Sequence, residues 1–529
     1  MIPLDLARHR SPALMVSAVW MILLVMGHWS CSTGGLEVQT QLAKDGSELH
    51  TPLSQSDLTN AQRSVPGQGY DIVVDYAAVE GPPLAHGTNV WWTEEDAEMW
   101  TARWAELSPS HVRVPVFHAI LEPQNDNNDP NETDWSGFLF ETPIVVAGEP
   151  ARSLTYKGWF EALRSMPDVN VVLYFPYLAP WLSKNDPIAG FPIPAAPHPP
   201  NDLAEYREFV TAILRYLVES IGLPATRITV EVTNEPDLLC GVDPATACFW
   251  EDWTMDDIAG VVQATYEAVR NVDEDIELVG LAECQGTGVV RELMDNYPQG
   301  RYLDGLSFHY YSPSGFKLNP VLGRARELAP YGRPLYLDEY GSRQFLSEGK
   351  DGALWHSWAL VTLWNAGIAP LQYPISEYPL IGEPYNSMGL FENWLGEWSR
   401  KPSYWVFANF FRHMGHDERL ACTAPSDMDI LAARRVPGQE VQVAFWVVNR
   451  GDSPLVDRTF AVSGFPGQEA TLFVYDNLAS LAPVLSMSAA GSPLVFTATL
   501  PARSSYTFVI RKTTDLYLPV ILRRDVRPR

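Results

Sequence analysis

The sequence is poor in basic residues and in cysteines, and both shortages exclude functions. Lys and Arg number 37 against 64 Asp and Glu, which gives a formal net charge of −27. A chain with this charge repels polyanions, so we expect no nucleic-acid partner. Only five cysteines are present, and none belongs to a Cys-x-x-Cys pair or to a Cys/His group with zinc spacing. We therefore expect no metal centre.

Long apolar runs are also scarce, and the run near the amino terminus is short. Ala13–Gly27 is nearly all apolar, follows the basic stretch Arg8-His9-Arg10 and precedes the small residues Ser30-Cys31-Ser32. A membrane-spanning helix needs about 20 apolar residues, so this pattern favours a signal peptide over residues 1–31. The prediction is a secreted or cell-surface protein. A lipid on Cys31 and an uncleaved amino-terminal anchor are the alternatives, and we expect no other membrane contact.

Export would permit disulfide bonds among the remaining cysteines. These are Cys240, Cys248, Cys284 and Cys422. Cys240 and Cys248 bracket a short loop rich in turn residues, so they are a candidate pair.

The length and the changes in sequence texture predict two domains. The chain has 529 residues, more than the roughly 250–300 at which a single core stops growing. Residues 32–68 are polar and aperiodic, and we interpret them as a flexible tether. Residues 84–412 alternate apolar runs with amphipathic segments, and residues 413–512 consist of short strand-like runs separated by turn residues. Residues 513–529 form a loose tail in this interpretation.

The alternation over residues 84–412 predicts an α/β fold with a parallel sheet. Apolar runs predicted as strands include Val112–Val116, Val169–Phe175, Ile228–Val232, Ile276–Gly280, Gly305–Phe308 and Pro334–Leu337. About eight such units fit a (β/α)8 TIM barrel. A doubly wound sheet is the alternative, but no glycine-rich phosphate loop follows an early strand. We expect no cofactor.

The region 413–512 predicts a smaller carboxy-terminal antiparallel β-sandwich. We also expect the segment 69–83, with a strand near Asp71–Asp75, to pair with this domain. A separate two-stranded patch would be marginal in water, and pairing would cover an exposed sheet edge.

Two glutamates follow predicted barrel strands at the points where catalytic residues of such barrels lie. Glu235 comes after the run Ile228–Val232, and Glu339 comes after Pro334–Leu337. Active sites in this fold are built at the carboxyl ends of the strands. A pair of carboxyl groups is what glycoside cleavage requires, one to protonate the leaving oxygen and one to attack the anomeric carbon. We predict that the two lie about 5–5.5 Å apart, as in retaining enzymes.

The residues around these glutamates are similar to a known group of enzymes. Ile228-Thr-Val-Glu-Val-Thr-Asn-Glu-Pro-Asp-Leu238 resembles the strand-4 signature of the clan A glycoside hydrolases. Ser307–Tyr311 resembles the strand-6 segment, and Pro334-Leu-Tyr-Leu-Asp-Glu-Tyr-Gly341 resembles the strand-7 nucleophile segment. The resemblance spans roughly residues 70–410. It is strongest to family 39, which includes β-xylosidases and α-L-iduronidases.

The resemblance implies roles for four residues. Glu235 matches the acid/base and Glu339 the nucleophile. Asn234 matches the residue that binds the sugar 2-hydroxyl, and Arg113 matches an arginine that supports the nucleophile electrostatically.

Further candidates line the same predicted cleft. His309 and Tyr311 are two residues apart on one strand, so they share a face and are expected to contact the sugar or the nucleophile. Trp181 is a candidate subsite wall, and His86 and Asn89 are weaker candidates.

Two positions depart from the family pattern. Thr233 stands where family 39 usually has Trp, and Tyr373 stands where the clan usually has a Trp at the floor of the site. Both put the sugar preference in doubt.

These observations predict a secreted retaining glycoside hydrolase acting on a plant or microbial oligo- or polysaccharide. A transglycosylase with the same residues is one alternative, and products formed with and without an acceptor sugar would separate the two. A non-catalytic carbohydrate-binding barrel is the other, but it would be expected to lack Asn234 or one of the glutamates, and all three are present.

Overall fold

The structure is a computed structural model of the chain. It describes residues 58–59, 69–90, 97–146, 149–150, 155–184, 195–238, 250–345, 349–375, 388–392, 399–435, 440–467 and 469–512. The predicted signal peptide with Cys31, the predicted tail and both Cys240 and Cys248 lie outside these residues. Cys284 is disulfide-bonded and Cys422 is a free thiol.

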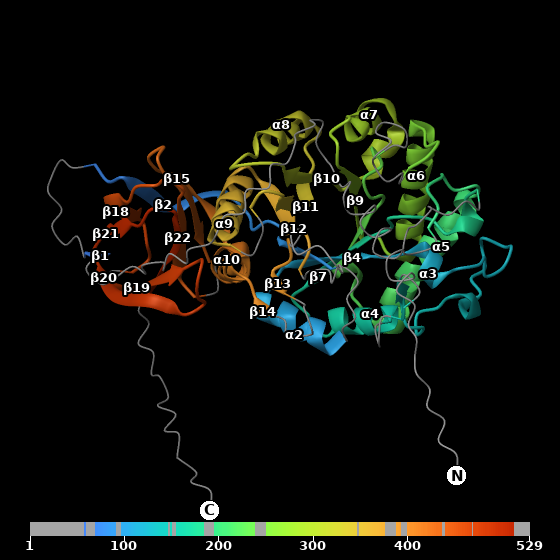
Figure 1. The fold of residues 1–529 in the computed structure, drawn as a ribbon, viewed down its shortest axis with the longest axis horizontal. Coiled ribbons are helices and arrows are strands. Elements are labelled where there is room, and N and C mark those ends of the chain that lie inside the picture. Colours follow the sequence, from blue (N-terminus) through green and yellow to red (C-terminus); the bar gives the residue numbers. More distant parts are fainter. Residues whose placement is uncertain are drawn as a thin grey trace, which may run out of the picture. The chain divides into compact units, whose positions relative to one another are not determined.

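The described chain divides into two compact units, drawn in Figure 1. The first unit contains residues 84–415, and the second combines 58–59 and 69–83 with 416–512. The sequence predicted that the barrel domain ends at residue 412. The observed end lies three residues later because the π-helical segment Phe411–Gly415 continues the helix α10 (Pro402–Phe410).

Eight parallel strands of the first unit close into a barrel, in the order β10-β11-β12-β3-β4-β7-β8-β9. The strands are β3 (Gly87–Asn89), β4 (His111–Pro115), β7 (Asn170–Tyr174), β8 (Ile228–Glu231), β9 (Glu277–Glu283), β10 (Gly305–Ser312), β11 (Leu335–Ser342) and β12 (Ile368–Gln372). Closure confirms the TIM-barrel prediction and excludes the doubly wound alternative, because a doubly wound sheet has two free edges.

Helices connect successive barrel strands and surround them in Figure 1. They are α2 (Ala97–Leu107), α3 (His118–Leu121), α4 (Tyr156–Arg164), α5 (Leu203–Arg215), α6 (Met255–Val272), α7 (Val289–Asn296), α8 (Asn319–Leu328) and α9 (Lys350–Asn365). A short hairpin, β5 (Val145–Val146) with β6 (Glu149–Pro150), lies in the connection between β4 and β7, and a second, β13 (Phe391–Glu392) with β14 (Ser399–Arg400), follows the last barrel strand. No helix among the described residues is long and apolar enough to cross a membrane.

Local sequence explains where the helices begin. Thr254 caps α6 by accepting a hydrogen bond from the Asp257 amide, and the Asp257 carboxylate accepts one from the Thr254 amide in return. This capping box satisfies amides that the helix itself leaves unpaired. Asp202 caps α5 through its side chain. Since the helices pack over the strands, the strands are buried on both sides and contain almost continuous apolar runs.

The second unit is a ten-stranded sheet in the order β1-β21-β18-β2-β15-β16-β17-β22-β19-β20. Its strands are β1 (Leu58–Thr59), β2 (Ile72–Gly81), β15 (Glu418–Thr423), β16 (Asp429–Arg434), β17 (Gln442–Asn449), β18 (Leu455–Ser463), β19 (Glu469–Asp476), β20 (Pro483–Ala490), β21 (Leu494–Leu500) and β22 (Ser504–Lys512).

This sheet folds over on itself around one apolar core. Phe460 of β18 and Phe508 of β22 are separated by four strands in the sheet order, yet their ring centroids lie 5.2 Å apart. Phe445 of β17 and Phe496 of β21 are likewise in ring contact at 6.1 Å. The predicted β-sandwich is therefore present, with two faces packed on a shared core.

Strand β2 lies inside this sheet, between β15 and β18. Its residues Ile72 and Val74 are fully buried, whereas Val73 between them is 37% exposed. The segment predicted to pair with the β domain does so. It pairs in parallel with β18, so the sheet is not purely antiparallel as predicted.

Leu58 and Thr59 lie within the segment predicted as an unstructured tether, but they pair with β21. The tether prediction is wrong at these two residues, because strand β21 offers a sheet edge that polar composition alone does not reveal.

Candidate active site

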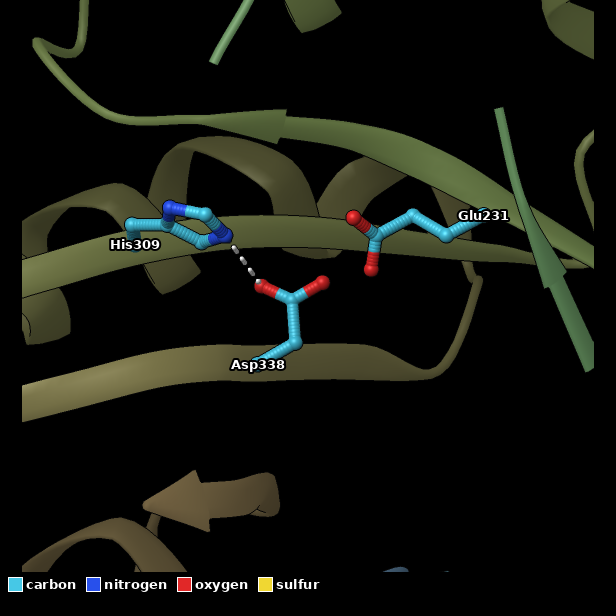
Figure 2. A group of neighbouring side chains, drawn as sticks. All are labelled: Glu231, His309 and Asp338. Carbon is cyan, nitrogen blue, oxygen red and sulfur yellow. Dashed lines mark ion pairs between the residues drawn. The ribbon is translucent and has the colours of Figure 1, made fainter. Parts of the chain in front are cut away.

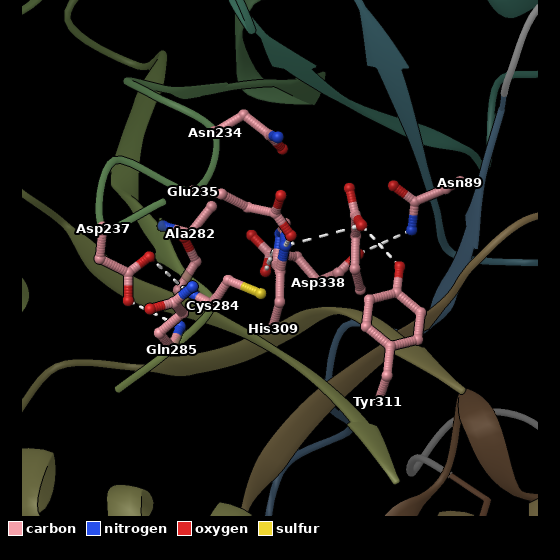
Figure 3. A network of polar contacts seen from close by, with 12 residues as sticks. Asn89, Asn234, Glu235, Asp237, Ala282, Cys284, Gln285, His309, Tyr311 and Asp338 are labelled. Carbon is pink, nitrogen blue, oxygen red and sulfur yellow. Dashed lines mark hydrogen bonds and ion pairs between the residues drawn. The ribbon is translucent and has the colours of Figure 1, made fainter. Parts of the chain in front are cut away.

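The carboxyl ends of five barrel strands bring the predicted site residues together (Figure 3). Asn89 ends β3, Arg113 lies in β4, Asn234 and Glu235 follow β8, His309 and Tyr311 lie in β10, and Glu339 lies in β11. All seven are at least 96% buried. Parallel strands in a closed barrel end on the same face, which is why residues as far apart as 89 and 339 meet.

The two candidate catalytic glutamates face each other across His309. The His309 Nδ1 atom lies 2.8 Å from Glu235 Oε1 and 3.6 Å from Glu339 Oε2. One carboxylate oxygen of each glutamate and a ring nitrogen of His309 lie within 4.8 Å of one another. The spacing is shorter than the roughly 6.5–9.5 Å at which inverting enzymes hold their carboxyl groups to admit a water molecule, and retaining enzymes hold theirs about 5–5.5 Å apart.

Glu339 is surrounded by groups that favour its ionised form. Arg113 Nη1 donates to Glu339 Oε1 at 2.5 Å, and the Tyr311 hydroxyl donates to Glu339 Oε2 at 2.7 Å. Burial raises the pKa of Glu339 above its ordinary value, and the contacts with Arg113 and Tyr311 limit that rise by stabilising the ionised form. A carboxylate held by a cation and a hydroxyl, with no proton of its own, can act as a nucleophile.

Glu235 has the opposite surroundings. Burial and the neighbouring Glu339 raise the pKa of Glu235 well above its ordinary value. Its hydrogen-bond partner His309 is neutral, because burial and the nearby Arg113 lower the pKa of the imidazole. Glu235 is therefore protonated near neutral pH and can act as an acid.

The backbone of Glu235 is strained, with φ at 54°. A residue with a Cβ atom rarely adopts this left-handed conformation, and such strain often accompanies a functional side chain. The Glu235 amide donates to Ala282 O, and the Asp237 carboxylate accepts hydrogen bonds from the amides of Cys284 and Gln285 (Figure 3). The loop after β8 is thus fixed to the end of β9, which holds the strained conformation in place.

Arg113 is hydrogen-bonded to several of the other candidate site residues. It donates two hydrogen bonds to Glu231, one to Glu339, one to Asn89 and one to Asn234 Oδ1. Its guanidinium carbon also lies 3.6 Å from the centroid of the Tyr174 ring. Burial alone would lower the pKa of Arg113, but Glu231 and Glu339 raise it above its ordinary value. Because Asn234 Oδ1 accepts from Arg113, its amide nitrogen is left to donate to a ligand.

Beneath the site, Asp338 and Glu231 form a second carboxyl pair beside His309 (Figure 2). His309 Nε2 lies 3.4 Å from Asp338 Oδ1. Burial and Glu231 raise the pKa of Asp338 well above its ordinary value, so this carboxyl carries a proton. With Glu235 donating to Nδ1, the neutral imidazole has its own proton on Nε2, directed at Asp338.

Two groups of side chains around His309 have the donor types of a metal site, Glu231 with Asp338 and Glu235 with Glu339. Arg113 already binds one carboxylate in each group. The Arg113 guanidinium therefore supplies the positive charge that a metal ion would provide. The four carboxyl groups and His309 are better explained as a hydrogen-bonded network in which some carboxyl groups carry a proton.

The remaining candidates are placed differently. The Tyr373 ring packs edge-on against Tyr311, with centroids 6.2 Å apart, and Tyr311 in turn donates to Glu339. The Trp181 indole donates to Glu122 O at 3.0 Å and packs edge-on against His118.

His86 precedes β3 and packs against Trp364 and Phe411, so it lies at the amino end of its strand. The hypothesis that His86 lines the cleft is wrong, because the strand begins after it.

Sequence reasoning assigned no role to Glu231 or Asp338. The signal for Glu231 was present, since a glutamate inside the apolar run Ile228–Val232 must find a partner when both faces of the strand are buried. Nothing in the sequence identified Arg113 as that partner.

Comparison with solved structures shows that the fold of the chain is similar to that of glycoside hydrolases. Solved structures of similar fold include a family 30 subfamily 8 xylanase from Clostridium acetobutylicum, with a TM-score of 0.58, 17% identity, and coverage of 83% of this chain and 99% of that one. A monomeric β-xylosidase from Caulobacter crescentus has a TM-score of 0.58 and 16% identity, covering 84% of this chain and 100% of that one. A family 39 enzyme from Xanthomonas axonopodis pv. citri has a TM-score of 0.56 and 15% identity, covering 84% and 97%.

The fold is similar to the folds of these glycoside hydrolases of families 30 and 39. A β-xylosidase from Geobacillus stearothermophilus is 23% identical over 219 residues, which are 41% of each chain. This chain thus matches about two fifths of the length of that relative. No family model matches the sequence. This similarity of fold agrees with the resemblance found in the three sequence segments. The structures of families 30 and 39 are both similar in fold to this chain, although their sequence identity to it is low.

Proposed function

We propose that this protein is a retaining glycoside hydrolase in which Glu339 is the nucleophile and Glu235 is the acid/base. The observation that supports this most strongly is the asymmetry of the carboxyl pair. Glu339 contacts a cation and a hydroxyl donor, whereas Glu235 contacts a neutral imidazole. Two close carboxyl groups with opposite surroundings are what double displacement requires.

In the first step, the Glu339 carboxylate attacks the anomeric carbon and the bond from that carbon to the leaving oxygen breaks. Glu235 gives its proton to the leaving oxygen, and a covalent glycosyl-enzyme remains. In the second step, Glu235 takes a proton from water, and the resulting hydroxide displaces Glu339. Two inversions at one carbon restore the original configuration. The free amide of Asn234 donates to the sugar 2-hydroxyl.

For the substrate we propose pentose glycosides of the xylan type, from plant or microbial oligo- or polysaccharides. The support comes from what the similar proteins are named: β-xylosidases, xylanases and an α-L-arabinofuranosidase. A glucosidase from Croceicoccus marinus has a similar fold, so hexosides belong in the test. The first measurement is a panel of aryl β-xylosides, α-L-arabinofuranosides and β-glucosides together with xylan.

The mechanism is tested with substrates of different leaving-group quality. We expect Glu339→Gln to lower kcat by roughly 10⁴-fold or more on every substrate, as loss of a catalytic nucleophile does. Glu235→Gln should lower it by about 10²–10⁴-fold on poor leaving groups and far less in the first step with dinitrophenyl glycosides, which need little protonation. Proton NMR of the first product should show the anomeric configuration of the substrate.

Glu277→Gln is the matched control, since Glu277 is exposed at the amino end of β9. It should leave kcat unchanged. Inverted product would overturn the mechanism, and equal losses for both catalytic variants on every leaving group would overturn the assignment of roles.

We also propose that the protein is exported, on the strength of the basic, apolar and small-residue pattern over residues 1–31. Fractionation of expressing cells, followed by amino-terminal sequencing of the mature protein, tests this. Full-length protein in the cytosol would contradict it.

A further inference from the structure

A second group of acidic side chains lies beside the loop that follows β4, away from the catalytic glutamates. Glu122 follows the short helix α3, Asp126 belongs to the loop, and Glu208 lies on α5. One carboxylate oxygen of each lies within 4.8 Å of the others. Glu122 is fully buried and Glu208 is 95% buried. Three carboxyl groups this close repel one another strongly when ionised.

Glu208 is the member that is hardest to explain without a ligand. Neither of its carboxylate oxygens has a hydrogen-bond partner, although both are inaccessible to solvent. The Thr133 side chain lowers the pKa of Glu208, but burial dominates and raises it to about 8. Buried carboxylate oxygens are normally paired, so a missing partner indicates an ion or a proton at this position.

No basic side chain among the described residues neutralises the group. The ion-pair partner of Glu122 is His118, at 3.1 Å, and burial lowers the pKa of His118 to about 3, so the ring is neutral. The charged neighbours that raise the pKa of Glu208 are acidic: Asp126, Glu122 and Glu205. Burial likewise raises the pKa of Glu122 to about 8. The site thus places three carboxyl groups together with no basic ion-pair partner among the described residues, and burial makes the ionisation of Glu122 and Glu208 costly without a cation.

We propose that Glu122, Asp126 and Glu208 bind a Ca²⁺ ion. The donors are all carboxylate oxygens, which suit hard cations, whereas zinc sites in proteins draw on nitrogen and sulfur. Ca²⁺ accepts irregular oxygen geometry from loops, and Mg²⁺ demands a near-ideal octahedron. Two donors come from the end of α3 and the following loop and one from a helix, so the ion fixes the loop to α5.

Ca²⁺ binding at this position would also support Trp181. The carbonyl oxygen of Glu122 accepts the hydrogen bond from the Trp181 indole, and His118 packs between Trp181 and Phe209 of α5. Calcium binding at this loop would not depend on the proposed glycosidase activity.

The test uses the full chain after EDTA treatment, at pH 8.0, with CaCl₂ added up to 5 mM. We expect the melting temperature to rise by about 3 °C in a saturable way, for a site of extracellular-type affinity. Isothermal titration calorimetry should give one Ca²⁺ per chain. Glu208→Gln and Asp126→Asn should each abolish most of the rise, and Glu208→Gln should be at least as stable as the wild type without calcium because one buried charge is removed.

Asp129→Asn is the matched control. Asp129 lies in the same loop, and its carboxylate accepts hydrogen bonds from Asn131, a contact that an amide oxygen can also make. This variant should keep the full calcium response. The proposal is overturned if calcium leaves the wild-type melting temperature unchanged, if Asp126→Asn responds like the wild type, or if MgCl₂ at the same concentration gives an equal rise. Asp126→Asn decides the case if Glu208→Gln does not fold.

Discussion

At the residue scale, the chemistry of the site depends on one arginine among four carboxyl groups. Arg113 binds Glu231 and Glu339, while Asp338 and Glu235 receive no hydrogen bond from it. The two carboxyl groups that Arg113 binds are the ones whose charge it can stabilise, and the other two have a pKa well above the ordinary value. Arg113 therefore stabilises the charge of Glu339, the proposed nucleophile, and makes no hydrogen bond to Glu235, the proposed acid.

The Tyr311 hydroxyl contributes to that assignment, and its removal gives a pH-dependent prediction. Tyr311→Phe removes the hydrogen bond to Glu339 Oε2, so the pKa of Glu339 should rise. Activity needs ionised Glu339 and is lost as the pH falls through its pKa. The acid limb of the kcat/KM profile should therefore move to higher pH, with kcat falling about 10- to 100-fold, as for a hydrogen bond to a charged group.

Tyr310→Phe is the control for this measurement, because Tyr310 is the next residue of β10 and points to the other face. Its pH profile should match that of the wild type. An unchanged acid limb in Tyr311→Phe would show that the hydroxyl does not act on the nucleophile.

At the element scale, strand β2 precedes the barrel in the sequence but belongs to the sheet of the second unit. It lies between β15 and β18, so both of its edges are paired. Ile72 and Val74 point into the core with Phe460 and Val462, and Val73 points outward. The alternation over these three residues is the period of a strand with one buried face.

Substitutions along β2 should separate the two faces. We expect Ile72→Ala to lower the free energy of unfolding of the second unit by about 2–4 kcal/mol, because it leaves a cavity in the core. Val73→Ala, a change of similar chemistry on the exposed face, should stay within about 0.5 kcal/mol. Hydrogen exchange of residues 416–512 measures both. Equal protection in the two variants would mean that β2 contributes nothing to the stability of this sheet.

At the scale of the whole molecule, the charge of −27 should influence which polysaccharides are bound. Like charges repel over a Debye length, which is about 10 Å at 0.1 M salt and about 30 Å at 0.01 M. A xylan that carries uronic acid groups should therefore have a KM that falls at least about twofold when NaCl is raised from 10 to 200 mM.

A neutral aryl xyloside is the control substrate, because it carries no charge for the protein to repel. Its KM should not change with salt. A parallel fall for both substrates would assign the effect to the salt itself instead of to the charge of the protein.

The sequence alone determined the fold class and the positions of the strands that matter. Runs such as Ile228–Val232 and Pro334–Leu337 are local patterns, and a buried parallel strand must be apolar wherever it lies in the chain. Because catalytic residues in a barrel follow such strands, Glu235 and Glu339 could be selected without coordinates. The β2 pairing was also predictable, since three apolar residues between two aspartates needed a sheet.

Only the tertiary structure decided how these residues act on one another. The hydrogen bonds from Arg113 to Glu231 and Glu339 join residues 118 and 226 positions apart, and no local pattern encodes such a pairing. The same holds for Glu122, Asp126 and Glu208, which come from a helix end, a loop and a second helix. Periodicity specifies which face of a strand or helix is buried, but a pKa or an ion site depends on distances between elements, and these exist only once the barrel has closed.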